Sequence, residues 1–293
     1  MASVIQILLH SLTDVGILAL FTLGITLTFK TAGVANFAQG IVATVGAFIA
    51  AYMLTRAGIN PWLSGLGGIA FCFIFGWAVD FFIVNKMKSG PMGRVMVTLG
   101  LILIVDAFIP MIFGMIPYNY PRYFPGIFEF TMFGARFTMP RNSLFIIIVA
   151  TGVIAVTFLA LYKTKWGLTM RATASNPVVS AMMGINTKRL TALSWAVSSA
   201  VASLSAILLA SQRTSVDAAM LGTTGTLALL ALVIGGITSF YGPIVGAVII
   251  PILLSLMAMI DGLWANVMMY SVVLLIILVR PHGLFGKKTM EKI

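Results

Sequence analysis

The sequence predicts an all-α fold, a polytopic transmembrane helical bundle of about eight or nine passes with broken helices. Of the 293 residues, 60% are hydrophobic and only 9% are charged, and the mean hydropathy of +1.08 lies far above that of soluble domains. Apolar runs of about 20 residues recur, which is the length at which a helix crosses a bilayer with its backbone groups hydrogen-bonded internally. The alternating pattern of barrel strands is not seen. We therefore expect residues 1–293 to form a single transmembrane domain.

Nine apolar segments follow one another along the chain. They lie at 7–29, 35–55, 62–85, 95–117, 143–162, 191–211, 226–237, 243–260 and 264–280. The seventh is too short to cross the membrane at about 1.5 Å per residue unless it begins earlier, near Ala218, or is a broken or re-entrant helix. Both eight and nine passes therefore stay open. The first segment follows neither a basic leader nor a clear cleavage site, so we expect it to be retained as a helix.

The basic residues predict the orientation of the chain. Its net charge of +11 would suggest a nucleic-acid partner in a soluble protein, but cytoplasmic loops of membrane proteins also collect Lys and Arg, and we expect no nucleic acid. With 163–190 in the cytoplasm, 13 of the 18 basic residues lie on that side, namely Lys30, Lys86, Lys88, Arg94, the five within 163–190, Arg280, Lys287, Lys288 and Lys292. This predicts a cytoplasmic loop at 163–190, a basic cytoplasmic tail at 281–293 and, with nine passes, an external N-terminus.

The stretch from 118 to 142 is then an external loop. Its sequence, YNYPRYFPGIFEFTMFGARFTMPRN, is rich in proline, glycine and aromatic residues, which suits an ordered surface at the level of the lipid headgroups. One interpretation is an aromatic belt that anchors the helices. The other is a docking face for an external partner.

No catalytic or metal site is visible in the sequence. Cys72 is the only cysteine, and His10 and His282 are isolated, so neither a disulfide framework nor a metal site is expected. The nearest match to a phosphate-binding loop, GLFGKKT at 283–289, has the wrong glycine spacing and no preceding strand. We predict that the chain is not an enzyme, has no catalytic residues and binds no cofactor itself.

Two glycine-broken apolar segments predict a path through the membrane. The first, 33–53, brings Asn36 and Gln39 into the membrane beside glycines, and the second, 227–250, contains Gly235 and Gly236. Irregular backbone is tolerated at membrane depth only where it lines protein or a cavity, and paired broken helices mark the binding region of many transporters. Both segments contain a Gly-Ala step, which suggests an internal repeat. The alternative is that small residues only allow close helix packing.

Two acidic residues lie within apolar segments. Asp106 sits near the middle of TLGLILIVDAFIPMIFG, where a carboxylate costs several kcal/mol unless it is protonated, paired or wetted. It either serves the translocation path or makes a structural hydrogen bond. Asp80 is nearer the predicted cytoplasmic end and could contact Lys86 or water, so we interpret it as structural.

The loop at 163–190 contains a short helix outside the membrane. In ASNPVVSAMMGI, Asn176 is placed to cap the helix, Pro177 to occupy its first turn and Gly184 to end it. Val178, Ala181 and Met182 would share one face. Such a helix could rest on anionic lipid or insert into a groove of a cytoplasmic protein.

Several ordered motifs resemble a known family. NFAQG at 36–40, TKWGLTMRATASNPVVSAMMGIN at 164–186, VIGG at 233–236, YGPIVGAV at 241–248 and RPHGLFG at 280–286 resemble the permease subunits of branched-chain amino-acid ABC transporters, of the LivH type. The resemblance implies a type II ABC importer permease in the plasma membrane of a prokaryote. Its implied partners are a second, LivM-like permease, two cytoplasmic ATPases that hold the ATP, and an external substrate-binding protein. The implied cargo is leucine, isoleucine and valine, although close relatives carry urea, short amides or other amino acids.

The resemblance also implies roles for individual residues. The segment from Arg171 to Gly184 corresponds to the coupling helix that seats in the ATPase, so the coupling candidates are Arg171, Asn176, Pro177, Ala181, Gly184 and Ile185. The NFA-x-G motif adds Phe37 and Gly40 to the path, so the path candidates are Asn36, Phe37, Gln39, Gly40, Asp106, Gly235 and Gly236. Gln39 stands where family members often have His, and His282 where they often have Gln. The competing hypothesis is a proton-coupled secondary transporter that uses Asp106.

Overall fold

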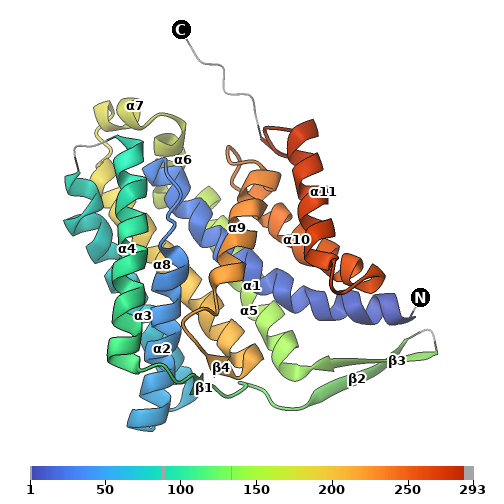
Figure 1. The fold of residues 1–293 in the computed structure, drawn as a ribbon. Coiled ribbons are helices and arrows are strands. Elements are labelled where there is room, and N and C mark those ends of the chain that lie inside the picture. The colour runs from blue at the N-terminus through green and yellow to red at the C-terminus, as the bar shows by residue number, and fades with distance from the viewer. Residues whose placement is uncertain (1, 88–89, 133, 287–293) are drawn as a thin grey trace.

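The computed structural model describes residues 2–87, 90–132 and 134–286, and over these residues the protein is a helical bundle (Figure 1). Seven helices are long and apolar enough to cross a membrane, namely α1 Ala2–Ala32, α2 Gln39–Ala57, α3 Pro61–Phe82, α4 Pro91–Phe113, α5 Arg141–Lys163, α8 Thr187–Arg213 and α10 Gly242–Ile260. Two shorter apolar helices are α9 Gly222–Gly235 and α11 Ala265–Val279. Each predicted apolar segment thus corresponds to one helix, and the all-α transmembrane class is confirmed.

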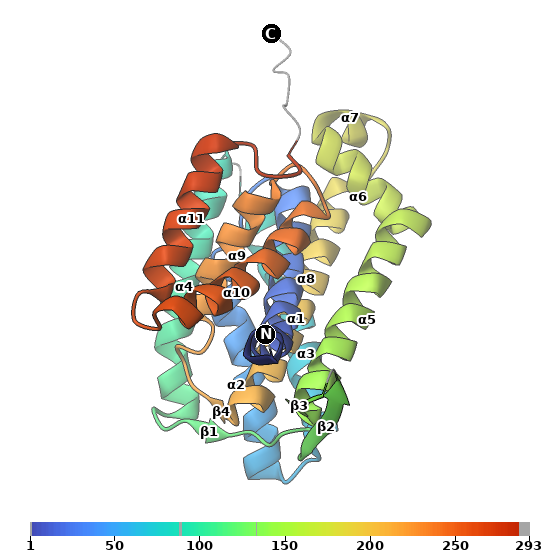
Figure 2. The same ribbon diagram turned by 90° about the vertical axis from the view of Figure 1, so that its right-hand side faces the viewer.

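Helices α1 and α8 form the centre of the bundle. Figure 2 shows them flanked by α5 on one side and by α9, α10 and α11 on the other, while α2 and α3 pack on α8. α8 is the most buried of the seven long helices, because serines and alanines along it let its neighbours approach closely. Leu20 and Phe21 of α1 are fully buried within this centre.

The chain breaks between α1 and α2 and re-enters the bundle. The sequence predicted an apolar segment from 35, but the helix begins at Gln39, because the Asn36 side chain accepts a hydrogen bond from the Ala38 amide (3.1 Å) and forms a turn there. Gln39 Nε2 in turn donates to the carbonyl of Phe21 (3.4 Å). α2 therefore begins at the depth of Phe21, roughly three turns before the end of α1.

The seventh apolar segment is a short helix, as one of the predicted alternatives required. α9 has 14 residues and starts at Gly222 rather than near Ala218. Before it, the strand β4 Ser215–Val216 pairs with β1 Tyr118–Asn119, and a turn follows in which Asp217 accepts from the Ala219 amide (3.0 Å). α9 therefore also begins inside the bundle, beside the start of α2.

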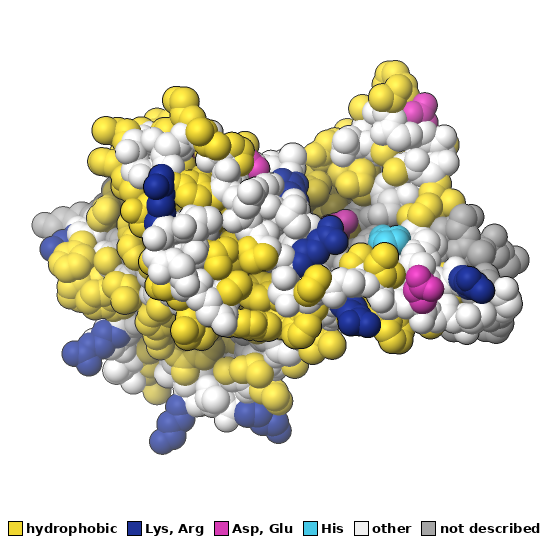
Figure 3. Space-filling view, turned by 90° about the horizontal axis from the view of Figure 1, so that it is seen from below, with side chains coloured by type: hydrophobic (Ala, Val, Ile, Leu, Met, Phe, Trp, Pro, Cys, Tyr) yellow, Lys and Arg dark blue, Asp and Glu magenta, His cyan; other side chains and the backbone are white. Residues whose placement is uncertain are grey.

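The stretch from 118 to 142 contains strands that the sequence did not predict. β2 Ile127–Met132 and β3 Ala135–Pro140 form an antiparallel hairpin that projects from the bundle below α5 (Figure 2). The hairpin was not predicted, although apolar and polar residues alternate along FEFT within β2. Seen from below, the molecule carries Lys, Arg, Asp and Glu side chains scattered among hydrophobic ones (Figure 3).

The opposite end of the bundle carries short helices outside the long ones. They are η1 Val84–Lys86, α6 Lys165–Ser175 and α7 Pro177–Met182, and the segment after α11 lies at the same end (Figure 1). α7 is the short helix predicted from Asn176 and Pro177. α6 was missed; it begins where the Thr164 hydroxyl accepts from the Gly167 amide (3.2 Å), and it packs beside α5 and α7.

Candidate translocation site

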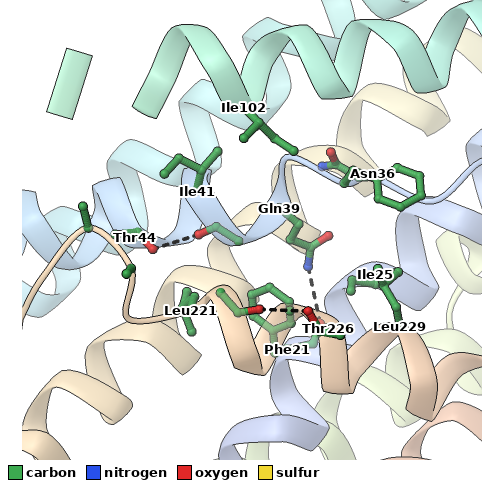
Figure 4. A pocket seen from close by; sticks show the side chains of 16 residues that line it. Phe21, Ile25, Asn36, Gln39, Ile41, Thr44, Ile102, Leu221, Thr226 and Leu229 are labelled. Atoms are coloured by element: carbon green, nitrogen blue, oxygen red, sulfur yellow. Dashed lines mark hydrogen bonds between the residues drawn. The ribbon is translucent and has the colours of Figure 1, made fainter. Parts of the chain in front are cut away.

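A cavity of about 300 Å³ lies where α2 and α9 begin. The break between α1 and α2 contributes Asn36 and Phe37, and the first turns of α2 contribute Gln39 and Gly40. The other walls come from α1, α2, α4, α9 and the turn before α9, with Phe21, Ile25, Ile41, Thr44, Ile102, Leu221, Gly222, Gly225, Thr226 and Leu229 (Figure 4). Four of the predicted path residues therefore lie together on one cavity.

The cavity is lined mainly by apolar groups, and none of its lining residues carries a charge. Its polar side chains bond within the protein. Thr44 Oγ1 donates to the Gly40 carbonyl (3.0 Å), and Thr226 Oγ1 donates to the Gly222 carbonyl (3.1 Å). Asn36 is only 2% exposed, and its side-chain oxygen accepts from Ala38. Such a lining suits a small solute with apolar parts and few hydrogen-bonding groups better than a multiply charged one.

Gln39 is held from both sides by the central helices. Its Nε2 points from α2 toward the α1 backbone, as Figure 4 shows, and its Oε1 accepts from Ser198 Oγ on α8 (3.0 Å). Ser198 Oγ also lies 2.7 Å from the Gly24 carbonyl of α1. Three helices thus meet at this amide, which makes it the best-anchored polar group of the cavity. Ser198 was not among the predicted residues.

Gly235 and Gly236 lie away from the cavity. They end α9 at the α6–α7 end of the molecule, where Gly236 has a φ of +99°. The amides of Leu284 and Phe285 donate to the carbonyls of Ile234 (2.7 Å) and Gly235 (3.1 Å). The VIGG and RPHGLFG motifs therefore pack on each other, and a Cβ atom on Gly235 would collide with the Gly242 carbonyl. In this structure the two glycines serve close packing.

Asp106 lines a different cavity, of about 260 Å³, nearer the β1–β4 end. It shares that cavity with Asp217 and Phe48, and its own side chain is exposed. Ala218 borders this cavity as well as the one at Gln39. The two cavities are thus neighbours, separated by the turn that leads into α9, and Asp106 lies on the one closer to the end of the bundle.

The predicted coupling residues surround α7. Asn176 Oδ1 accepts from the amides of Val178 and Val179 (3.1 Å each), and Gly184 ends the helix in a left-handed conformation with a φ of +83°. Ala181 is exposed, and Val178 is 62% and Met182 80% exposed, so α7 presents an apolar face to its surroundings.

Arg171 and Ile185 lie behind that face. The guanidinium of Arg171 sits over the ring of Tyr162, 4.9 Å from its centroid, which ties α6 to the end of α5. Ile185 is half-buried and lines a groove of about 420 Å³ between α6 and α7, together with Leu168 and Met183. These two residues therefore shape the support of α7 rather than its exposed surface.

Several cavity residues were missed from the sequence. Gly222, Gly225 and Thr226 of α9 lie across the cavity from Gln39, and Phe21 and Ile25 complete the wall on α1. A signal was present in GTTGT at 222–226, where small and polar residues open the short seventh apolar segment. Within the described residues no group of three or more His, Cys, Asp or Glu side chains could hold a metal ion.

Comparisons with known proteins point to one family. A family model described as "Branched-chain amino acid transport system / permease component" matches residues 7–279. The chain is 27% identical to the probable branched-chain amino acid transport permease protein LivH of Methanocaldococcus jannaschii, with 92% of this chain and 89% of that protein covered. It is 25% identical to the high-affinity branched-chain amino acid transport system permease protein LivH of Escherichia coli K12, with 94% and 93% covered.

A third relative extends the match to almost the whole chain. It is the high-affinity branched-chain amino acid transport system permease protein BraD of Pseudomonas aeruginosa, 25% identical over 99% of this chain and 98% of that protein. No solved structure matches significantly. Because the family model extends from the first membrane helix to the last, the chain belongs to the permease components of branched-chain amino acid transport systems.

Proposed function

We propose that this chain is the LivH-type permease subunit of an ABC importer and forms part of the translocation path for branched-chain or related small neutral amino acids. The observation that carries the proposal is the uncharged, mainly apolar cavity at the broken start of α2, into which the NFAQG motif brings Asn36 and Gln39. Leucine, isoleucine and valine carry one apolar side chain and a compact polar end, and this lining suits both parts.

We infer that the α6–α7 end faces the cytoplasm of a prokaryotic cell. The described basic residues support this orientation because most of them lie at helix ends or loops on that side, namely Lys30, Lys86, Arg94, Lys163, Lys165, Arg171, Lys188, Arg189 and Arg280. Lys88, Lys287, Lys288 and Lys292 lie outside the described residues. The N-terminus and the β2–β3 hairpin are then external, on the side from which a substrate-binding protein would deliver its ligand.

The exposed apolar face of α7 supports a coupling role. Val178, Met182 and Met183 expose most of their surface, at an end of the molecule where several Lys and Arg side chains point to water. An apolar patch rimmed by charge is typical of a protein-binding surface. On this proposal α7 seats in a cytoplasmic ATPase, ATP is bound and hydrolysed by two such partner subunits, and a second permease completes the path.

The mechanism that we propose is alternating access. Movement of the ATPases would displace α7 and α6, and these short helices continue directly into α5 and α8, which pack on α1. The cavity at Gln39 would open first toward the Asp106 cavity and then toward the α7 end. A proton-coupled secondary transporter, the competing hypothesis, receives no support from the family match.

Purification of the intact assembly tests the proposal. The chain is extracted from its native membrane in a mild detergent, captured through a tag and analysed by mass spectrometry. Recovery of two ATPase subunits and a second permease is the expected result. Recovery of this chain alone, in a detergent that preserves a control ABC transporter, would contradict it.

The substrate class is tested separately with the reconstituted assembly. Vesicles that contain all the subunits and an external binding protein are supplied with labelled leucine, isoleucine, valine, urea or a short amide. We expect ATP-dependent uptake of the three amino acids. Uptake of urea or an amide in their place would keep the importer assignment and change the cargo.

A further inference from the structure

Asp80 is a buried carboxylate that does not line the cavity at Gln39. It lies in the last turn of α3 and has no exposed surface. The sequence suggested contact with Lys86 or water, but Lys86 lies over the ring of Phe82 instead (5.5 Å). The Oδ2 atom of Asp80 accepts from Asn85 Nδ2 and lies 3.2 Å from Thr191 Oγ1. A buried carboxylate is costly unless it is hydrogen-bonded, so this cluster demands an explanation.

The cluster joins α3 and η1 to the first turns of α8. Asn85 Nδ2 also donates to the carbonyl of Lys188 (3.1 Å). The hydroxyl of Thr191 is within reach of three acceptors, namely Asp80 Oδ2 (3.2 Å), Asn85 Oδ1 (3.2 Å) and the Lys188 carbonyl (3.0 Å). A hydroxyl has a single proton, so it can donate to only one of the three at a time. At the cluster the ends of α3 and α8 can therefore shift slightly against each other while Thr191 exchanges Asp80 or Asn85 for the Lys188 carbonyl of its own helix.

The cluster lies next to the segment that carries α7. Asp80, Asn85 and Thr191 line a cavity of about 480 Å³ whose other walls include Thr173 of α6 and Pro177, the first residue of α7. Open space thus separates α7 from the end of α3. A displacement of α7 can be transmitted by the covalent link into α8 without an immediate collision with α3.

α8 carries such a displacement directly to the cavity at Gln39. Ser198, about two turns along α8 from Thr191, holds the Gln39 side chain (3.0 Å). Between these points α3 packs on α8 without any gap: a Cβ atom on Gly76 would collide with the Trp195 carbonyl and with Ser199. Beyond the cluster α3 and α8 must therefore move together, and α2 moves with them through Gln39.

We propose that Asp80, Asn85 and Thr191 form a coupling joint, whose residues position α8 so that movement of α7 reaches Gln39. This inference rests on the proposed function, because it presumes that α7 is driven by an ATPase. Asp80, Asn85 and Thr191 are positioning residues, since they touch neither substrate nor nucleotide. Their loss should change how much transport each hydrolysed ATP supports, which a merely structural bond would leave unaltered.

The test compares variants of Thr191 in the complete reconstituted transporter, with ATP hydrolysis and leucine uptake measured on the same vesicles. Thr191→Val keeps the volume and removes the hydroxyl, and Thr191→Ser keeps the hydroxyl. The matched control is Thr157→Val on α5, where the lost hydroxyl donates to the Val153 carbonyl of its own helix (2.8 Å). Thr191→Val should keep ATP hydrolysis within roughly twofold of wild type and lower uptake per ATP roughly fivefold. Thr191→Ser and Thr157→Val should keep the wild-type ratio of leucine uptake to ATP hydrolysis.

An unchanged ratio of leucine uptake to ATP hydrolysis in Thr191→Val would contradict the proposed coupling joint. If Thr191→Val fails to assemble, Asn85→Leu replaces it, since this variant keeps the approximate size and removes the amide that bonds Asp80, the Lys188 carbonyl and Thr191, and an unchanged ratio of uptake to ATP hydrolysis there has the same consequence. Failure of the proposed function is recognised separately, because the wild-type assembly would then show no ATP-dependent uptake at all. Wild-type uptake together with an unaltered Thr191→Val ratio refutes the joint alone.

Discussion

α7 and the break between α1 and α2 distribute polarity in opposite ways. At the end of α7, outside the long helices, Met182 and Met183 are 80% and 79% exposed, whereas at the break and the start of α2, inside an apolar bundle, Asn36 and Gln39 are 2% and 1% exposed. Apolar side chains in water and amides in hydrocarbon are each unfavourable in isolation. On the proposed function, this difference means that the first region binds a protein partner and the second lines a route for a polar group.

The largest expected effect comes from making α7 polar. In the double variant Met182→Asp, Met183→Asp, the chain should still insert but should lose its ATPases, with a roughly thirtyfold or greater loss of uptake, since central apolar contacts contribute about 2 kcal/mol or more each. Co-purification of the ATPases and uptake in vesicles measure it. The control is Leu263→Asp, an apolar residue that is 91% exposed in the turn between α10 and α11 and lines neither cavity. Retained ATPases in the double variant would contradict a coupling surface on α7.

The second largest effect is expected from filling the cavity at Gln39. Gly225 lines the cavity and has open space around its Cβ position, so Gly225→Leu can fold while its side chain occupies the route. We expect uptake to fall roughly tenfold or more, because the leucine takes the space of the solute. Gly152→Leu on α5 is the matched control, since it too has open space but lies away from the cavity. Equal uptake by the two variants would show that the cavity is not part of the translocation path.

Substitutions of Gln39 should have a smaller effect. Gln39→Leu keeps the approximate size but loses the bonds to Phe21 and Ser198, so the start of α2 should shift and uptake should fall roughly fivefold. Gln39→His, the residue that the resembling family often has there, retains a ring nitrogen that can accept from Ser198 and should lose less. Uptake kinetics at matched expression decide between the two. A harmless leucine and a damaging histidine would show that the amide has no role.

The smallest expected effect is at Asp106. Its carboxylate lies on the outer of the two cavities and not beside Gln39, so Asp106→Asn should lower uptake only about twofold, in the range of an exposed charge near a route. Asp261→Asn, at the turn between α10 and α11, is the control, because Asp261 caps that turn through the Leu263 amide (2.8 Å). A complete loss in Asp106→Asn would bring the proton-site hypothesis back.

Much of the architecture could be predicted because it depends on local properties. Each apolar segment became a helix, since in lipid a run of such residues satisfies its backbone only by coiling on itself. The cap at Asn176 and the end of α7 at Gly184 were predicted correctly for the same reason, because both depend on a few neighbouring residues. The strands at 127–140 were missed, because the composition of the stretch concealed a short alternating pattern.

The sequence by itself determined the membrane class, the nine apolar segments, the capped helix and, through five motifs, the family. Only the tertiary structure decided that Asn36, Phe37, Gln39 and Gly40 share a cavity with α9, that Gly235 and Gly236 pack on the segment after α11, and that Asp80 pairs with Asn85 and Thr191 rather than Lys86. The physical reason is sequence distance. Helix formation needs partners about four residues apart, whereas Asp80 and Thr191 are 111 residues apart and meet only when α3 and α8 pack.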